Sequence, residues 1–234
     1  MRMARQGRPW AVVITIAVSA LVAAGALATS ATLRHRDTAS ATTDETTPPP
    51  TSGVGVDGCK LEPCTVLATA QVGGTAVDLV ADRDGRSGRL RIGGAGASKV
   101  VEATITSMGA ALTPDSLQCV ADTLSACLLR GRSGDGMVGQ VVAGRSAAWS
   151  ELSQPFLSDA GYLALAQVTP DPGPEILVAQ RRCQTGQDCS ATAVFLRVYN
   201  LRSQDLGCTR DYSRVESLPA TLRTADLNPA NCGT

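Results

Sequence analysis

The chain has 234 residues, with 21 basic and 21 acidic side chains, eight cysteines and one histidine. The first 36 residues carry five arginines and no acid, so the rest has 16 basic and 21 acidic residues and a net charge of −5. An acidic body is a poor partner for phosphate backbones, and we expect no nucleic acid among the partners. The single histidine, His35, excludes Ser–His–Asp and Cys–His catalytic sites from the part that follows it.

Residues 10–33 form an apolar run that three arginines precede. About 21 of these residues lack a formal charge, enough for a helix to cross a hydrocarbon core of about 30 Å. The arginines favour a cytoplasmic position for residues 1–9. We therefore predict a signal anchor in the lipid bilayer and a single-pass plasma-membrane protein with an extracytoplasmic C-terminal domain. The alternative is a signal peptide that is cleaved near Ala28, which would make the protein secreted.

Residues 34–56 are rich in Thr, Ser and Pro and are expected to form a disordered stalk, followed by a folded domain over residues 57–234. All eight cysteines lie in that domain, and an oxidising compartment predicts four disulfides. Among many possible connectivities, we predict nearest-neighbour pairs: Cys59–Cys64, Cys119–Cys127, Cys183–Cys189 and Cys208–Cys232. Because no Cys-x-x-Cys occurs, we expect no metal, and no motif indicates a cofactor.

Short β-type runs separated by Gly, Asp and Pro predict an all-β fold for the domain. The expected strands span residues 65–72, 75–81, 89–93, 99–106, 126–130, 137–143, 149–152, 162–168, 175–182 and 191–200. One short helix is expected within residues 107–128, where Pro114-Asp115-Ser116 suits a first helical turn. The chain after Cys208 shows no clear pattern.

Several of these runs repeat. LATAQV at 67–72 matches LALAQV at 163–168, LVADR at 79–83 matches LVAQR at 177–181, and LRI at 90–92 matches LRV at 196–198. A third copy, VVAGR, stands at 141–145. Such units predict blade-like repeats in a β-propeller-like fold, with a β-sandwich as the alternative. The repeats place Arg83, Arg145 and Arg181 at matching positions, either as an anion-binding ring or as repeated strand-end charges.

The segment Ala166–Val178, AQVTPDPGPEILV, resembles an FG-GAP/VCBS-type β-propeller repeat, in which a loop rich in Asp and Gly leads to an acidic residue that opens the next strand. The resemblance implies a blade-like unit, with Glu175 as that acidic residue. The family loop often carries several Asp residues that bind calcium, whereas Asp171 stands alone here, so calcium is not implied. Asp82-Arg83-Asp84-Gly85 lacks the further ligands of a calcium loop and is interpreted as a turn.

A pair of carboxylates remains as a possible catalytic arrangement. The candidates are Asp78, Asp159, Asp171, Glu175 and Glu216, and no spacing selects two of them. We therefore expect no catalytic residue and a non-enzymatic binding domain at the cell envelope, with an envelope protein or wall polymer as partner. The alternatives are a carboxylate-based hydrolase of envelope glycans and a structural accessory subunit of a membrane complex. Clustered arginines or aromatic residues would favour binding, and facing carboxylates in a deep pocket would favour the hydrolase.

Overall fold

The computed structural model describes residues 59, 61, 63–146, 148–183, 189 and 191–233. The predicted anchor and stalk lie outside these residues and stay predictions. Among the described residues, no helix is both long enough and apolar enough to cross a membrane. The chain divides into two units, Met1–Thr51 and Ser52–Thr234, and the second unit contains the fold described below.

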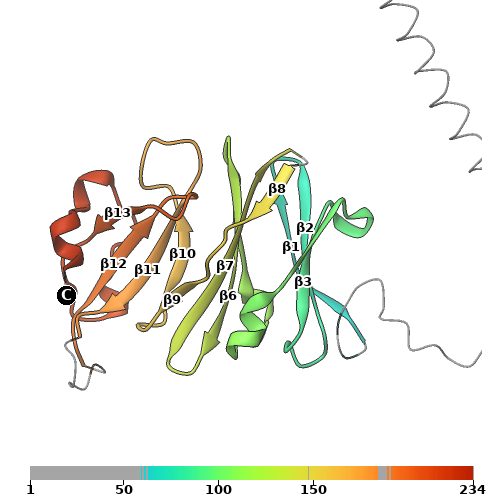
Figure 1. Ribbon diagram of the computed structural model, residues 1–234, viewed down its shortest axis with the longest axis horizontal. Helices are drawn as coiled ribbons and strands as arrows, with labels where there is room; N and C mark the ends of the chain where they lie inside the picture. The colour runs from blue at the N-terminus through green and yellow to red at the C-terminus, as the bar shows by residue number, and fades with distance from the viewer. Residues whose placement is uncertain are drawn as a thin grey trace, which may run out of the picture. The chain divides into compact units, whose positions relative to one another are not determined.

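Three antiparallel sheets make up the described part of this unit (Figure 1). In sheets A and C the strands follow one another in chain order, and in sheet B they do so up to β8. Sheet A contains β1 (Thr65–Val72), β2 (Thr75–Ala81), β3 (Gly88–Ile92) and β4 (Lys99–Glu102). Sheet B contains β5 (Leu117–Val120), β6 (Ser125–Ser133), β7 (Gly136–Arg145), β8 (Ala148–Glu151) and β9 (Phe156–Ser158), with β8 and β9 on the same partner, β7. Sheet C contains β10 (Leu163–Ala166), β11 (Glu175–Arg181), β12 (Val194–Tyr199) and β13 (Asp205–Cys208).

Short 3₁₀ helices occupy the connections and the C-terminal segment. They are η1 (Gly94–Gly96), η2 (Thr104–Met108), η3 (Pro114–Ser116), η4 (Val215–Ser217), η5 (Thr224–Asp226) and η6 (Pro229–Cys232). The all-β class is therefore confirmed. The described sheets do not close into a barrel.

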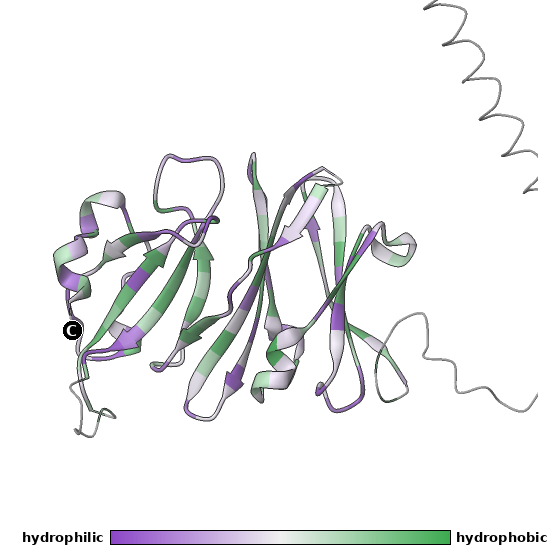
Figure 2. Ribbon diagram, in the orientation of Figure 1, coloured by the Kyte–Doolittle hydropathy of each residue, from purple (hydrophilic) through white to green (hydrophobic). Residues whose placement is uncertain are grey.

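Two apolar cores hold the sheets together face to face. Successive side chains of a strand point to opposite faces, so Leu129 of β6 packs with Leu79 and Leu90 of sheet A. Its neighbour Leu128 packs with Ile176 of sheet C. Sheet B is thus buried on both faces, and most residues of its long strands β6 and β7 are buried. Figure 2 shows hydrophobic stretches in these strands beside hydrophilic ones.

The two outer faces of this stack differ. On sheet C, Leu177, Leu196 and Val198 pack against apolar side chains of residues 215–227, which cover the face. On sheet A the outer face is polar, because Asp78 pairs with Arg91 at 3.2 Å and accepts a hydrogen bond from Thr69 at 2.8 Å. A closed ring would need these two faces to meet, and the C-terminal segment already occupies one of them.

One glutamine side chain joins each pair of neighbouring sheets. Gln118 of β5 accepts the N–H of Leu165 at 3.1 Å and donates to the carbonyl of the same residue at 3.0 Å. Gln140 of β7 accepts the N–H of Thr104 at 2.8 Å and donates to the carbonyl of Glu102 at 2.8 Å. An amide side chain can replace a backbone partner in this way, since it offers both a donor and an acceptor.

The predicted strands are confirmed in most places, and β1 and β2 have the predicted bounds. The helix expected within 107–128 is wrong. Thr113 caps a single 3₁₀ turn at Pro114–Ser116, and the chain then forms β5 because residues 117–120 pair with β6. The predicted strand 99–106 ends at Glu102, where η2 follows. Strands β9 and β13 were not expected.

The repeats of the sequence fall on equivalent strands of sheets A and C. The first pair of matching segments lies in β1 and β10, the second pair in β2 and β11, and the third pair in β3 and β12. The third copy at 141–145 is not equivalent, since it lies in β7, the third strand of sheet B, rather than in a second strand. A buried strand is rich in Val and Ala for packing reasons alone, which explains the similarity.

All four predicted disulfides are confirmed, in the predicted pairing: Cys59–Cys64, Cys119–Cys127, Cys183–Cys189 and Cys208–Cys232. Cys119 and Cys127 lie directly opposite each other in β5 and β6. Cys208–Cys232 ties the C-terminal segment to β13, the last strand of sheet C.

Candidate functional site

A pocket of about 510 Å³ lies where loops of sheet C meet sheet B. Its walls come from the β10–β11 loop, residues 167–174, from the β12–β13 turn, residues 200–204, and from Leu124 and Arg145 of sheet B. We call it the loop pocket. It contains the segment that resembles a propeller repeat, including Asp171 and Glu175.

Glu175 holds the β10–β11 loop from the inside. Its side chain is buried, with the residue 2% exposed, and accepts hydrogen bonds from the backbone N–H groups of Val168 at 2.7 Å and Thr169 at 3.4 Å. The hydroxyl of Thr169 also donates to it. These donors satisfy a carboxylate that would otherwise be costly to bury. Glu175 therefore serves the loop structure and does not act as a free acid or base.

Further contacts fix the same loop. Gln167 donates from Nε2 to the carbonyls of Thr169 and Asp171, both at 2.9 Å. The N–H of Gly173 donates to the carboxylate of Asp122 at 3.2 Å. Gly173 has a φ of +118°, and a Cβ atom there would lie 2.9 Å from the carbonyl oxygen of Leu124, so only glycine fits. The loop thus forms a fixed wall.

The opposite wall is a turn that Asn200 organises. Its Oδ1 accepts the N–H groups of Arg202 at 2.9 Å and Gln204 at 3.0 Å, and its Nδ2 donates to Oε1 of Gln204 at 2.8 Å. Asparagine is frequent in turns because its side chain bonds to the backbone two residues on. The position of Arg202 at the pocket is therefore set by the turn.

Two arginines give the loop pocket its charge. Arg145 donates from Nε to the carbonyl of Thr123 at 2.8 Å, which leaves its terminal nitrogens for a ligand. Within the described residues, neither Arg145 nor Arg202 forms an ion pair. Asp171 is the exposed carboxylate of the pocket, since Glu175 is buried in hydrogen bonds. Guanidinium groups bind carboxylates and phosphates through paired hydrogen bonds, so the pocket is suited to an anion.

The structure does not bring the three predicted arginines together. Arg83 is exposed beyond the end of β2 in sheet A, and Arg145 lies at the loop pocket. Arg181 lies at the far end of β11, where its N–H donates to Asp159 at 2.8 Å. An arginine ring is therefore not formed. Sequence reasoning missed Arg202, for which the neighbouring turn residue Asn200 is the only signal.

The carboxylate candidates are also separated. Asp78 pairs with Arg91, Asp159 accepts the N–H of Arg181, and Glu216 is exposed in the C-terminal segment. Asp171 and Glu175 share a pocket, but Glu175 is already hydrogen-bonded on both oxygens. Among the described residues, no two of the candidates face each other as a free pair.

The partial calcium-loop segment forms a turn, as interpreted. Asp82 is 2% exposed, and its carboxylate accepts the N–H of Arg86 at 2.9 Å. Its carbonyl accepts the N–H of Gly85 at 3.1 Å. These contacts account for the buried carboxylate without a metal ion.

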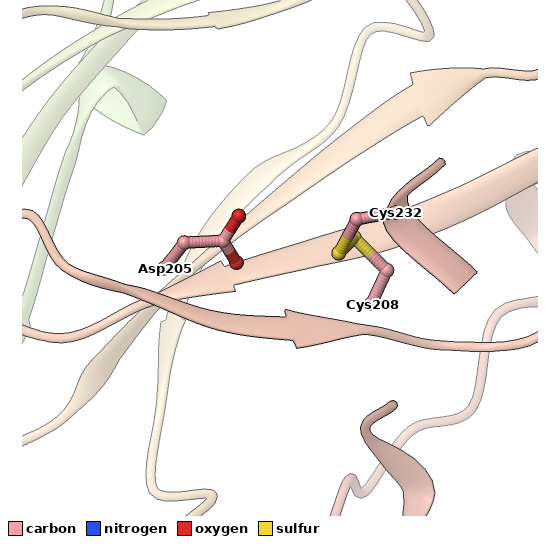
Figure 3. Close-up of side chains that lie close together, drawn as sticks. All are labelled: Asp205, Cys208 and Cys232. Carbon is pink, nitrogen blue, oxygen red and sulfur yellow. A yellow bond between two sulfur atoms is a disulfide. The ribbon is translucent and has the colours of Figure 1, made fainter. Parts of the chain in front are cut away.

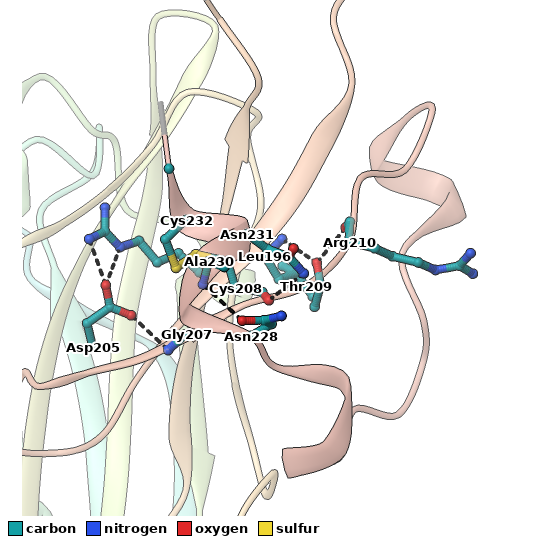
Figure 4. The surroundings of a disulfide bond; sticks show 12 residues. Leu196, Asp205, Gly207, Cys208, Thr209, Arg210, Asn228, Ala230, Asn231 and Cys232 are labelled. Atoms are coloured by element: carbon teal, nitrogen blue, oxygen red, sulfur yellow. Dashed lines mark hydrogen bonds and ion pairs between the residues drawn. A yellow bond between two sulfur atoms is a disulfide. The ribbon is translucent and has the colours of Figure 1, made fainter.

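Asp205, Cys208 and Cys232 place a carboxylate oxygen and two sulfurs within 4.8 Å of one another (Figure 3). The sulfurs are bonded to each other, so neither is the thiolate that a metal would need. The carboxylate of Asp205 accepts hydrogen bonds from Nε of Arg197 at 2.8 Å and from the N–H of Gly207 at 2.9 Å. Figure 4 shows these contacts beside the disulfide. The cluster is a structural anchor for β13.

Two pKa shifts occur beside this anchor. The hydrogen bond with Asp205 raises the pKa of Arg197 above its ordinary value, so this guanidinium keeps its charge. Burial raises the pKa of the Tyr199 hydroxyl, although the nearby charge of Arg197 opposes the shift. Both groups therefore keep their usual protonation state at neutral pH.

No family model, no curated protein and no solved structure matches this chain.

Proposed function

We propose that residues 57–234 form a non-enzymatic binding domain that takes an anionic ligand in the loop pocket. The observation that supports this is the pair Arg145 and Arg202 on a pocket whose two loop walls, residues 167–174 and 200–204, are fixed by internal hydrogen bonds. A preformed site loses little conformational entropy when it binds, which favours recognition by a few charged groups. The volume of about 510 Å³ lies in the range of small-ligand sites.

The hydrolase alternative has less support. It needs two carboxylates on either side of a scissile bond, one of them able to donate a proton. Glu175 already accepts hydrogen bonds from backbone N–H groups and a hydroxyl. Asp171 is therefore the carboxylate of the pocket that is exposed. The accessory-subunit alternative would rest on an apolar docking patch, whereas the exposed large apolar residues are spread over different segments: Leu61 precedes β1, and Val66, Val100 and Leu157 lie in β1, β4 and β9.

The domain is further proposed to lie outside the cytoplasm of a single-pass plasma-membrane protein that residues 10–33 hold in the bilayer. Four disulfides support this, because such bonds persist in oxidising compartments. Secretion after cleavage near Ala28 would satisfy the same observation. In either location, the anionic ligand would belong to an envelope protein or to an acidic wall polymer.

The sheets are proposed to be related to propeller blades. Sheets A and C are meanders of strands in chain order, and similar sequence segments occupy the first, second and third strands of both. This architecture matters for the proposed site, because blade-like sheets present their loops at their ends. The loop pocket lies among such loops.

Neutralising either arginine of the loop pocket should weaken anion binding. In an NMR titration of the full-length chain with citrate, we expect Arg145→Gln and Arg202→Gln each to raise the dissociation constant about tenfold, the loss of one charge-assisted hydrogen-bond pair. The N–H of Gly173 should shift in the unmodified protein. Arg210→Gln is the matched control, since Arg210 is exposed and stacks on Tyr212 away from the pocket. Equal affinity in all three variants would refute the proposed site.

A further inference from the structure

A second basic surface lies at the end of sheets B and C opposite to the loop pocket. It consists of two adjoining pockets, of about 510 and 270 Å³, which share Arg132 and Gly161 as a common wall. Four arginines line the two pockets: Arg130, Arg132, Arg181 and Arg214. We call this surface the arginine groove. Two acidic side chains, Asp115 and Glu216, line it as well, so the arginines are in excess.

The larger pocket of the groove is mostly apolar. Ala111, Met137, Tyr162 and Leu163 contribute carbon surface to it. Arg130 is held at its wall, because its guanidinium donates to the carbonyl of Leu163 and to Oε1 of Gln118 at 3.3 Å. The pocket therefore offers space for an apolar group beside a positive charge that cannot move away.

The smaller pocket is polar and cationic. Arg181 and Arg214 line it together with the hydroxyl-bearing side chains Thr192 and Ser213. Between the two pockets, Arg132 is exposed, and its side chain forms no hydrogen bond or ion pair with the described residues. Its guanidinium is thus available at the point where the apolar pocket meets the cationic one.

This arrangement selects a ligand with two parts. A plain anion would leave the apolar pocket unused, and a neutral apolar molecule would make no use of the arginines. We propose that the arginine groove binds a small organic phosphate or carboxylate, with its apolar group in the larger pocket and its anionic group on Arg132. Such an anion is either a soluble metabolite or the headgroup of a lipid.

Phenyl phosphate, inorganic phosphate and phenol separate the two parts of the proposed ligand. In calorimetric titrations of the full-length chain, we expect phenyl phosphate to bind at least about tenfold more tightly than either of the other two, because burial of the ring adds to the ionic contact. Shifts of the Gly161 and Tyr162 amides in an NMR titration should place it in the groove. Similar affinities for phenyl phosphate and inorganic phosphate would overturn the proposal.

Two variants address the two parts separately. Arg132→Gln should weaken phenyl phosphate binding about tenfold, and Ala111→Phe, which fills the larger pocket, should do so without removing a charge. Arg86→Gln, on an exposed residue outside the groove, is the matched control and should bind as the unmodified chain does. Unchanged binding in Ala111→Phe would refute the role of the apolar pocket even if Arg132→Gln failed to fold.

Competition distinguishes the two sources of the anion. Displacement of phenyl phosphate by water-soluble dihexanoyl phosphatidic acid at lower concentration than by phenyl phosphate itself would identify a lipid headgroup as the source. Weaker displacement would identify a soluble aryl or alkyl phosphate. Both outcomes support the groove, whereas displacement by inorganic phosphate at the same concentration would overturn it. The loop pocket is formed by other residues and is tested with citrate. A negative result for one proposal is therefore distinguishable from a negative result for the other.

Discussion

Glu175→Ala is expected to lower the free energy of unfolding by about 3 kcal/mol, because it leaves the buried N–H of Val168 and the half-buried N–H and hydroxyl of Thr169 without their acceptor. Urea denaturation followed by circular dichroism measures this difference. Glu175→Gln is the matched control. It keeps one acceptor oxygen at nearly the same volume and should lose only about half as much stability.

The same variant connects the loop to the proposed function. Glu175→Ala should also weaken citrate binding in the loop pocket, since the wall formed by residues 167–174 would no longer be fixed. Phenyl phosphate binding in the arginine groove should stay as it is. A loss of less than about 0.5 kcal/mol in Glu175→Ala would show that the loop keeps its shape by other contacts.

Removal of the Cys208–Cys232 disulfide is expected to cost about 3 kcal/mol, because the bond closes a loop with a sequence separation of 24. The double variant Cys208→Ala/Cys232→Ala should also release the segment that covers Leu196 and Val198. Urea denaturation gives the stability loss, and binding of a hydrophobic dye reports the uncovered face of sheet C.

The disulfide Cys59–Cys64 provides the control for this prediction. Its sequence separation is only 5, so this bond restricts the unfolded chain much less than Cys208–Cys232 does. Its removal should therefore cost clearly less stability. Dye binding should not change in that double variant. Equal stability losses for the two pairs would contradict the loop-closure explanation.

The strands that the sequence predicts correctly are those whose signals are local. β1 and β2 are rich in Val, Ala and Thr and are separated by Gly73-Gly74, both of which have positive φ. β5 was missed because its four residues carry no pattern of their own and follow a proline that also suits a helix start. Its conformation comes from pairing with β6, where Cys119 lies opposite Cys127. The pairs Cys59–Cys64, Cys119–Cys127 and Cys183–Cys189 are predicted correctly because the two cysteines of each pair are separated by only 5, 8 and 6 positions in the sequence.

The candidate site was predictable only in part. Arg145 was selected for its place in a supposed repeat, and the structure puts it in the loop pocket for another reason, since β7 ends beside the loops of sheet C. Arg202 lies in a turn that no motif marks. Pockets made by loops from different sheets depend on how the sheets stack, and that information is not local in the sequence.

The glutamine contacts between sheets have a consequence for motion. The N–H of Leu165 depends on Gln118, and the N–H of Thr104 depends on Gln140. If sheets B and C part while A and B stay together, Leu165 loses its acceptor and Thr104 keeps its own. Hydrogen–deuterium exchange at these two amides therefore reports the opening of each junction on its own, and equal rates at both would mean that the three sheets come apart as one unit.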